Sequence, residues 1–128
     1  MKISEFNETK DSTDSFDQND ITQNKAMAVL SYFSILVLIP IFAAKDSKYA
    51  RYHANQGLAL LILEIIYSIF MSVLSAIILT ISAKLMFICY IFSLFSLVIL
   101  ALIIIGIVNS ASGRAKALPI IGGLHLIA

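Results

Sequence analysis

Residues 57–80 read GLALLILEIIYSIFMSVLSAIILT, an apolar run that one charged residue, Glu64, interrupts. Two similar runs flank it, at 26–44 and 85–108. About 20 apolar residues in a helix cross the ~30 Å hydrocarbon core of a bilayer, so all three runs are long enough. The sequence therefore predicts an all-α integral membrane bundle with three transmembrane helices, at 26–44, 57–80 and 85–108.

The composition agrees with a membrane environment. The 128 residues are 59% hydrophobic and 13% charged, against roughly 25% charged in a soluble domain. Six of the eight acidic residues lie before residue 21, in a stretch rich in Ser, Thr and Asn. We therefore expect two parts: a disordered acidic tail at 1–20, and a transmembrane domain at 21–128 that ends in a short interfacial tail.

The same counts disfavour several classes of function. A net charge of +1 provides no broad basic surface, so we expect no nucleic-acid partner. The single cysteine, Cys89, forms neither a disulfide framework nor a cysteine metal cluster. Glu64 and His53 lie about 16 Å apart along one helix, too far to share a nucleophile. We expect no enzyme, no cofactor and no metal.

The stretch before the second run, residues 44–58, reads AKDSKYARYHANQGL. Asp46 or Ser47 can cap a helix that leads into the second span. The aromatic and basic side chains that follow suit the headgroup level, so we expect a short interfacial helix there. It is either a topology anchor or a lipid or partner contact; the contact residues would be Arg51, His53, Asn55 and Gln56.

Glu64 is the one carboxylate inside an apolar run. At the centre of a span it costs on the order of 2.5–3.5 kcal/mol, so it needs a partner. Helical spacing aligns it with Ser68 and Ser75, and Ser34 of the first run lies at a similar depth. We expect these four residues to form an intramembrane polar seam, with Glu64 against Ser34 or Tyr67. The alternatives are a proton or ion relay in an oligomer, and simple tolerance near the interface.

Basic residues near the spans predict the orientation in the cytoplasmic membrane. Three spans place the first loop and the C-terminus together and the N-terminus opposite. The side with the first loop and the C-terminus carries five cations, and the side with the N-terminus carries four. This difference favours a cytoplasmic location for the first loop and the C-terminus. The five are Lys45, Lys48, Arg51, Arg114 and Lys116; the four are Lys2, Lys10, Lys25 and Lys84.

Three segments resemble a known family: KAMAVLSYF at 25–33, YARYHANQGL at 49–58 and GRAKALPIIG at 113–122. They are similar to small bacterial and archaeal membrane proteins labelled Tic-twenty-like, after a chloroplast protein-import component. The resemblance covers about residues 24–127. It implies a helical membrane domain whose signature is the corner from Arg51 to Gln56, although the plastid protein has four spans.

The function we expect is that of a non-enzymatic accessory or interaction subunit of a membrane complex. Its partners would be the lipid bilayer and either other membrane proteins or a second copy. Protein translocation is a role that the resemblance implies. The alternatives are an oligomeric transport or channel component and an immunity protein against a toxin or bacteriocin.

Overall fold

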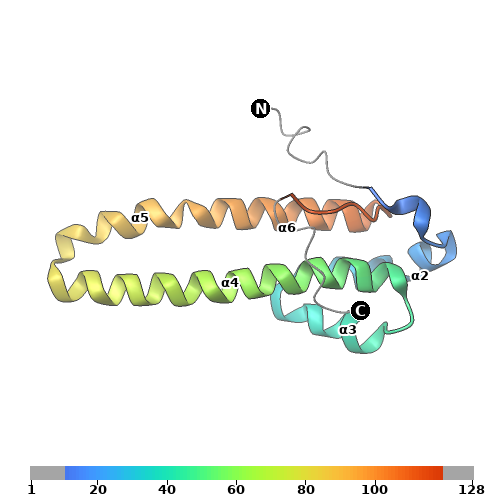
Figure 1. Ribbon diagram of the computed structural model, residues 1–128, viewed down its shortest axis with the longest axis horizontal. Helices are drawn as coiled ribbons and strands as arrows, with labels where there is room; N and C mark the ends of the chain where they lie inside the picture. Colours follow the sequence, from blue (N-terminus) through green and yellow to red (C-terminus); the bar gives the residue numbers. More distant parts are fainter. Residues whose placement is uncertain (1–10, 120–128) are drawn as a thin grey trace.

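The computed structural model describes residues 11–119, and this part of the chain is all-helical, as predicted (Figure 1). Its only extended pairing is an isolated bridge between Asp11 and Lys116. In chain order the helices are η1 (Thr13–Ser15), α2 (Gln18–Leu30), η2 (Ser34–Val37), α3 (Leu38–Ala43), α4 (Lys48–Ile81), η3 (Ala83–Met86), α5 (Phe87–Ser93) and α6 (Phe95–Ala111).

Two helical stretches are long and apolar enough to cross a membrane, Lys48–Ile81 and Ala83–Ala111. At 1.5 Å per residue they are about 51 Å and 44 Å long, which exceeds the ~30 Å hydrocarbon core. Figure 1 shows α4 and α5–α6 side by side, joined by a turn at one end, with α2 and α3 at the other. The runs at 57–80 and 85–108 lie within these two stretches.

The run at 26–44 is not one continuous helix, so the structure does not confirm the first of the three predicted spans. Helix α2 stops at Leu30, Ser34 adopts a φ of 55°, and η2 and α3 run back alongside α2. The returning apolar segment, Ser34–Ala43, is shorter than a span requires. The chain after α3 returns to the first turn of α2, because the Ser47 hydroxyl donates to Asp20 over 2.5 Å. Residues 18–47 therefore form a helical hairpin that starts and ends at the same end of the molecule.

The predicted cap before the second span is confirmed. Ser47 caps α4, because its Oγ accepts a 3.0 Å hydrogen bond from the Ala50 amide. No break separates residues 48–57 from the rest of α4, so the short interfacial helix is the beginning of this long helix. The boundary expected after residue 20 falls inside α2. Residues 1–10 of the acidic tail and 120–128 of the interfacial tail lie outside the described residues.

The described part of the tail contacts the C-terminal segment. The Ser12 amide donates to the Ala115 carbonyl over 2.8 Å, and the Ala115 amide donates to Thr13 Oγ1 over 3.0 Å. The side chain and amide of Thr13 also donate to Asp11, which lowers the pKa of the Asp11 carboxyl; Arg114 and Lys116 contribute less. The described tail residues thus lie at the same end as the first loop and the segment after α6.

Both clusters of buried apolar side chains lie toward this end, whereas near the opposite turn Ile78 and Cys89 are buried. One cluster contains Ile21, Ala28, Tyr49 and Ala115, and a second contains Tyr32, Leu60, Leu102 and Leu118. The opposite half of the long helices exposes large apolar side chains, among them Ile69, Ile77, Phe87 and Leu94. Such surfaces suit lipid, because the backbone polar groups are satisfied within each helix.

Candidate functional site

The most elaborate polar arrangement surrounds His53, on the second turn of α4. His53 is 0% exposed, and its Nδ1 lies 2.5 Å from the Tyr32 hydroxyl. Its Nε2 lies 2.9 Å from the carbonyl oxygen of Arg114. A carbonyl only accepts, so Nε2 carries the hydrogen and Nδ1 accepts from the tyrosine. His53 thus joins the tip of the hairpin to the segment after α6.

Tyrosine rings enclose the imidazole. Tyr32, Tyr49 and Tyr52 each meet the His53 ring edge to face, with centroids 5.5, 4.9 and 5.3 Å away. The Tyr49 hydroxyl donates to the Ser110 carbonyl over 2.8 Å, which ties α4 to the end of α6. The rings therefore shield the hydrogen bonds of His53 from water. They also join the hairpin, α4 and the end of α6.

Gln56 repeats the pattern one helical turn later. Its side chain is 2% exposed, and its Oε1 accepts a 2.6 Å hydrogen bond from the Leu118 amide. Its Nε2 donates to the Lys116 carbonyl over 3.5 Å. His53 and Gln56 lie on one face of α4, since residues three apart are neighbours on a helix. Together they hold residues 114–118 against the helix. We call His53, Gln56, Tyr32 and Tyr49 the C-terminal lock.

Two glycines allow the close approach that this arrangement needs. A Cβ on Gly57 would lie 1.8 Å from the Ser31 carbonyl oxygen, so the hairpin tip rests on the α4 backbone. A Cβ on Gly106 would lie 2.2 Å from the Tyr32 ring. Glycine at both positions leaves the room in which Tyr32 reaches His53.

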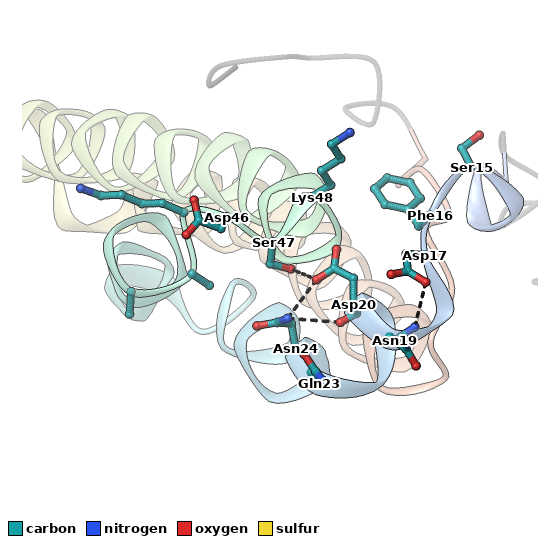
Figure 2. A pocket seen from close by; sticks show the side chains of 13 residues that line it. Ser15, Phe16, Asp17, Asn19, Asp20, Gln23, Asn24, Asp46, Ser47 and Lys48 are labelled. Atoms are coloured by element: carbon teal, nitrogen blue, oxygen red, sulfur yellow. Dashed lines mark hydrogen bonds between the residues drawn. The ribbon is translucent and has the colours of Figure 1, made fainter.

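A second polar group lies where the hairpin meets the start of α4, in a pocket of about 670 Å³. Figure 2 shows the Asp20 carboxylate pointing across to Ser47. The same carboxylate accepts from the Tyr49 amide over 3.0 Å and from Asn24 over 2.9 Å. Asp20 thus closes the hairpin and satisfies an amide in the first turn of α4. Within residues 11–119, no group of three His, Cys, Asp or Glu side chains could hold a metal ion.

The residues predicted to contact lipid or a partner have different surroundings. His53 and Gln56 are buried and bind the chain itself, whereas Arg51 and Asn55 are half-buried. The expected lipid or partner contact stays a prediction for Arg51 and Asn55. Tyr32 and Tyr49 were missed as site residues, although both lie in the segments that carry the family resemblance. Their role depends on contacts far apart in the sequence.

The four seam residues are only partly brought together. Glu64 and Ser34 line one hollow, which Ser96 of α6 also lines. Ser68 is exposed, and the Ser75 hydroxyl donates to the Ser72 carbonyl of its own helix over 3.1 Å. Tyr67 does not meet Glu64, because its hydroxyl donates to the Phe92 carbonyl over 3.1 Å.

Chemically, the C-terminal lock holds structure together. Its polar side chains bond to backbone groups or to one another, and no cysteine or carboxylate lies among them. One buried polar side-chain atom among the described residues has no partner, Nδ2 of Asn109 near the end of α6. The arrangement supports fastening of the hairpin and of the C-terminal segment.

Residues 23–125 match the model of a protein family described as the magnetosome magnetite crystal formation protein family, MamF/MmsF. No curated protein and no solved structure matches the chain. The assignment to a Tic-twenty-like family is therefore wrong. The three segments on which that resemblance rested all lie inside the region that matches the magnetosome family.

Proposed function

The chain belongs to the magnetosome magnetite crystal formation protein family, and from this premise we propose that it is a non-enzymatic membrane protein that takes part in forming magnetite crystals. The family match over residues 23–125 carries the proposal. The two long apolar helices support a place in the magnetosome membrane. The match lends no support to protein import or to toxin immunity.

A non-enzymatic role is supported by how the buried polar side chains are used. His53 and Gln56 direct their polar atoms to backbone groups or to the Tyr32 hydroxyl of the same chain. Catalysis would need a nucleophile and a base held toward a substrate. We propose instead that the protein acts by binding other membrane proteins or a second copy.

The proposed topology has two crossings, with residues 18–47 entering and leaving the membrane surface on one side. That end carries six described cations, and the opposite turn carries only Lys84. The six are Lys25, Lys45, Lys48, Arg51, Arg114 and Lys116. The positive-inside rule then favours a cytoplasmic location for the first loop and the segment after α6. It also favours a cytoplasmic location for the tail residues bonded to that segment, whereas three spans would place them outside.

Deletion and complementation in a magnetite-forming bacterium that carries this chain test the function. We expect electron microscopy to show fewer or smaller crystals in the deletion strain, and recovery when the wild-type chain is supplied. Complementation with the Glu64→Gln variant tests whether crystal formation needs the carboxylate in the apolar run. Complementation with the Tyr32→Phe variant tests whether it needs the C-terminal lock. Crystals of unchanged number and size in the deletion strain would refute the proposal.

A further inference from the structure

Glu64 lines a hollow of about 550 Å³ between the hairpin tip and the two long helices. Ser34 and Leu36 of the tip and Ser96, Leu100 and Ile103 of α6 line the same hollow. It is separate from the polar pocket beside Asp20. None of the functions proposed above uses it.

The Glu64 carboxylate has no partner in the described chain. The side chain is half-buried, and no hydrogen bond or ion pair joins it to another residue of 11–119. No Lys, Arg or His lines the hollow. An ionisable group in a span is costly without a partner, which marks it as a candidate binding group. A partner that suits the carboxylate supplies positive charge or hydrogen-bond donors.

The apolar walls of the hollow are exposed, and in the proposed topology they face lipid. Phe33, Leu36 and Leu100 are 46%, 40% and 50% exposed, although all three are large and apolar. An occupant that reaches Glu64 from this side passes along apolar side chains. A hydrated ion would lose water there without gaining enough ligands, since Mg²⁺ and Ca²⁺ take six or more oxygens.

The depth of Glu64 suits a headgroup. The helix from Glu64 to Ile81 is about 26 Å long at 1.5 Å per residue. With Ile81 at the far edge of a ~30 Å hydrocarbon core, Glu64 lies about 4 Å inside the near edge of an untilted helix. A lipid headgroup of the near leaflet can reach that level.

We propose that the hollow binds a lipid whose headgroup carries a primary ammonium, as in phosphatidylethanolamine. The ammonium has three N–H donors, which suit the Glu64 carboxylate and the oxygens of Ser34 and Ser96. The Ser96 hydroxyl already donates to the Ser93 carbonyl over 2.6 Å, so toward a ligand it is an acceptor. One acyl chain lies along Leu36, Leu100 and Ile103.

The test is native mass spectrometry of the full chain from bilayers of equal phosphatidylethanolamine and phosphatidylcholine. The choline headgroup keeps the positive charge but has no N–H donor. We expect the wild-type chain to retain the ethanolamine lipid about tenfold over the choline lipid, the preference that one charge-assisted hydrogen bond confers. Glu64→Gln should lose this preference. Asp46→Asn, which removes a carboxylate outside the hollow, should keep it.

Leu100→Trp, which fills the hollow from the lipid side and leaves Glu64 in place, is a second variant. It should lower retention of the ethanolamine lipid even if Glu64→Gln fails to fold. Equal retention of both lipids by the wild-type chain overturns the proposal, as does an undiminished preference in either hollow variant. A lipid-free dimer that Glu64→Gln dissociates would also overturn it, in favour of a second copy as the occupant.

Discussion

The Tyr32 hydroxyl is the only donor within residues 11–119 to Nδ1 of the fully buried His53. Tyr32→Phe keeps the ring and leaves Nδ1 unsatisfied, a loss of about 1–3 kcal/mol. We expect a lower midpoint of thermal unfolding in mild detergent. Tyr90→Phe is the control, since Tyr90 is 72% exposed. Equal midpoints for the two variants would show that the hydrogen bond does not stabilise the fold.

Gly57 lies where the backbone of the hairpin tip contacts the backbone of α4. An alanine methyl would overlap the Ser31 carbonyl oxygen, which belongs to backbone and cannot swing away. Overpacking of this kind costs about 1–3 kcal/mol. We expect Gly57→Ala to lower the free energy of unfolding, whereas Ser72→Ala at an exposed position of α4 should not. Unchanged stability of Gly57→Ala would mean that the hairpin tip does not rest on α4.

At the scale of elements, hydropathy predicted both long helices but not the hairpin. It measures how apolar a run is and cannot tell whether the helix continues. The chain turns at residues 31–34 because Tyr32 reaches a histidine 21 positions later and Gly57 admits the Ser31 carbonyl. The cap at Ser47 was predictable because it depends on neighbouring residues. The C-terminal lock was not, because its bonds join residues 21 or about 60 positions apart.

The segment after α6 is an element without regular structure that Gln56 fastens. Arg114 and Lys116 lie in it, so trypsin can report its release. Gln56→Ala removes the acceptor of the Leu118 amide, and we expect faster cleavage at these two sites. Ser68→Ala, at an exposed position of α4, is the control and should be cleaved at the wild-type rate. Equal rates in all three proteins would show that Gln56 does not hold the segment.

At the scale of the whole molecule, the hairpin changes which ends of the chain share a side of the membrane. The two-crossing arrangement places the described tail, the first loop and the segment after α6 together. The turn that contains Lys84 lies opposite. The three-span arrangement would pair the tail with Lys84, so labelling of single cysteines separates the two. Suitable exposed positions in a Cys89→Ala background are Ser15, Lys45, Ser112 and Lys84.

With the chain expressed in the cytoplasmic membrane of a bacterium without magnetosomes, we expect a membrane-impermeant maleimide to label Ser15→Cys, Lys45→Cys and Ser112→Cys in inside-out vesicles. It should label Lys84→Cys in intact spheroplasts. The physical reason is that Ser12 is bonded to Ala115, and Asp20 to Ser47, so these segments cannot lie on opposite sides without breaking the fold. If Ser15→Cys and Lys84→Cys are labelled from the same side, the three-span arrangement is correct and the first apolar run crosses the membrane. If all three positions at the charged end label from the cytoplasm, the exposed side chains of Asp14 and Asp46 face the cytoplasm, and only the short turn that contains Lys84 reaches the opposite side.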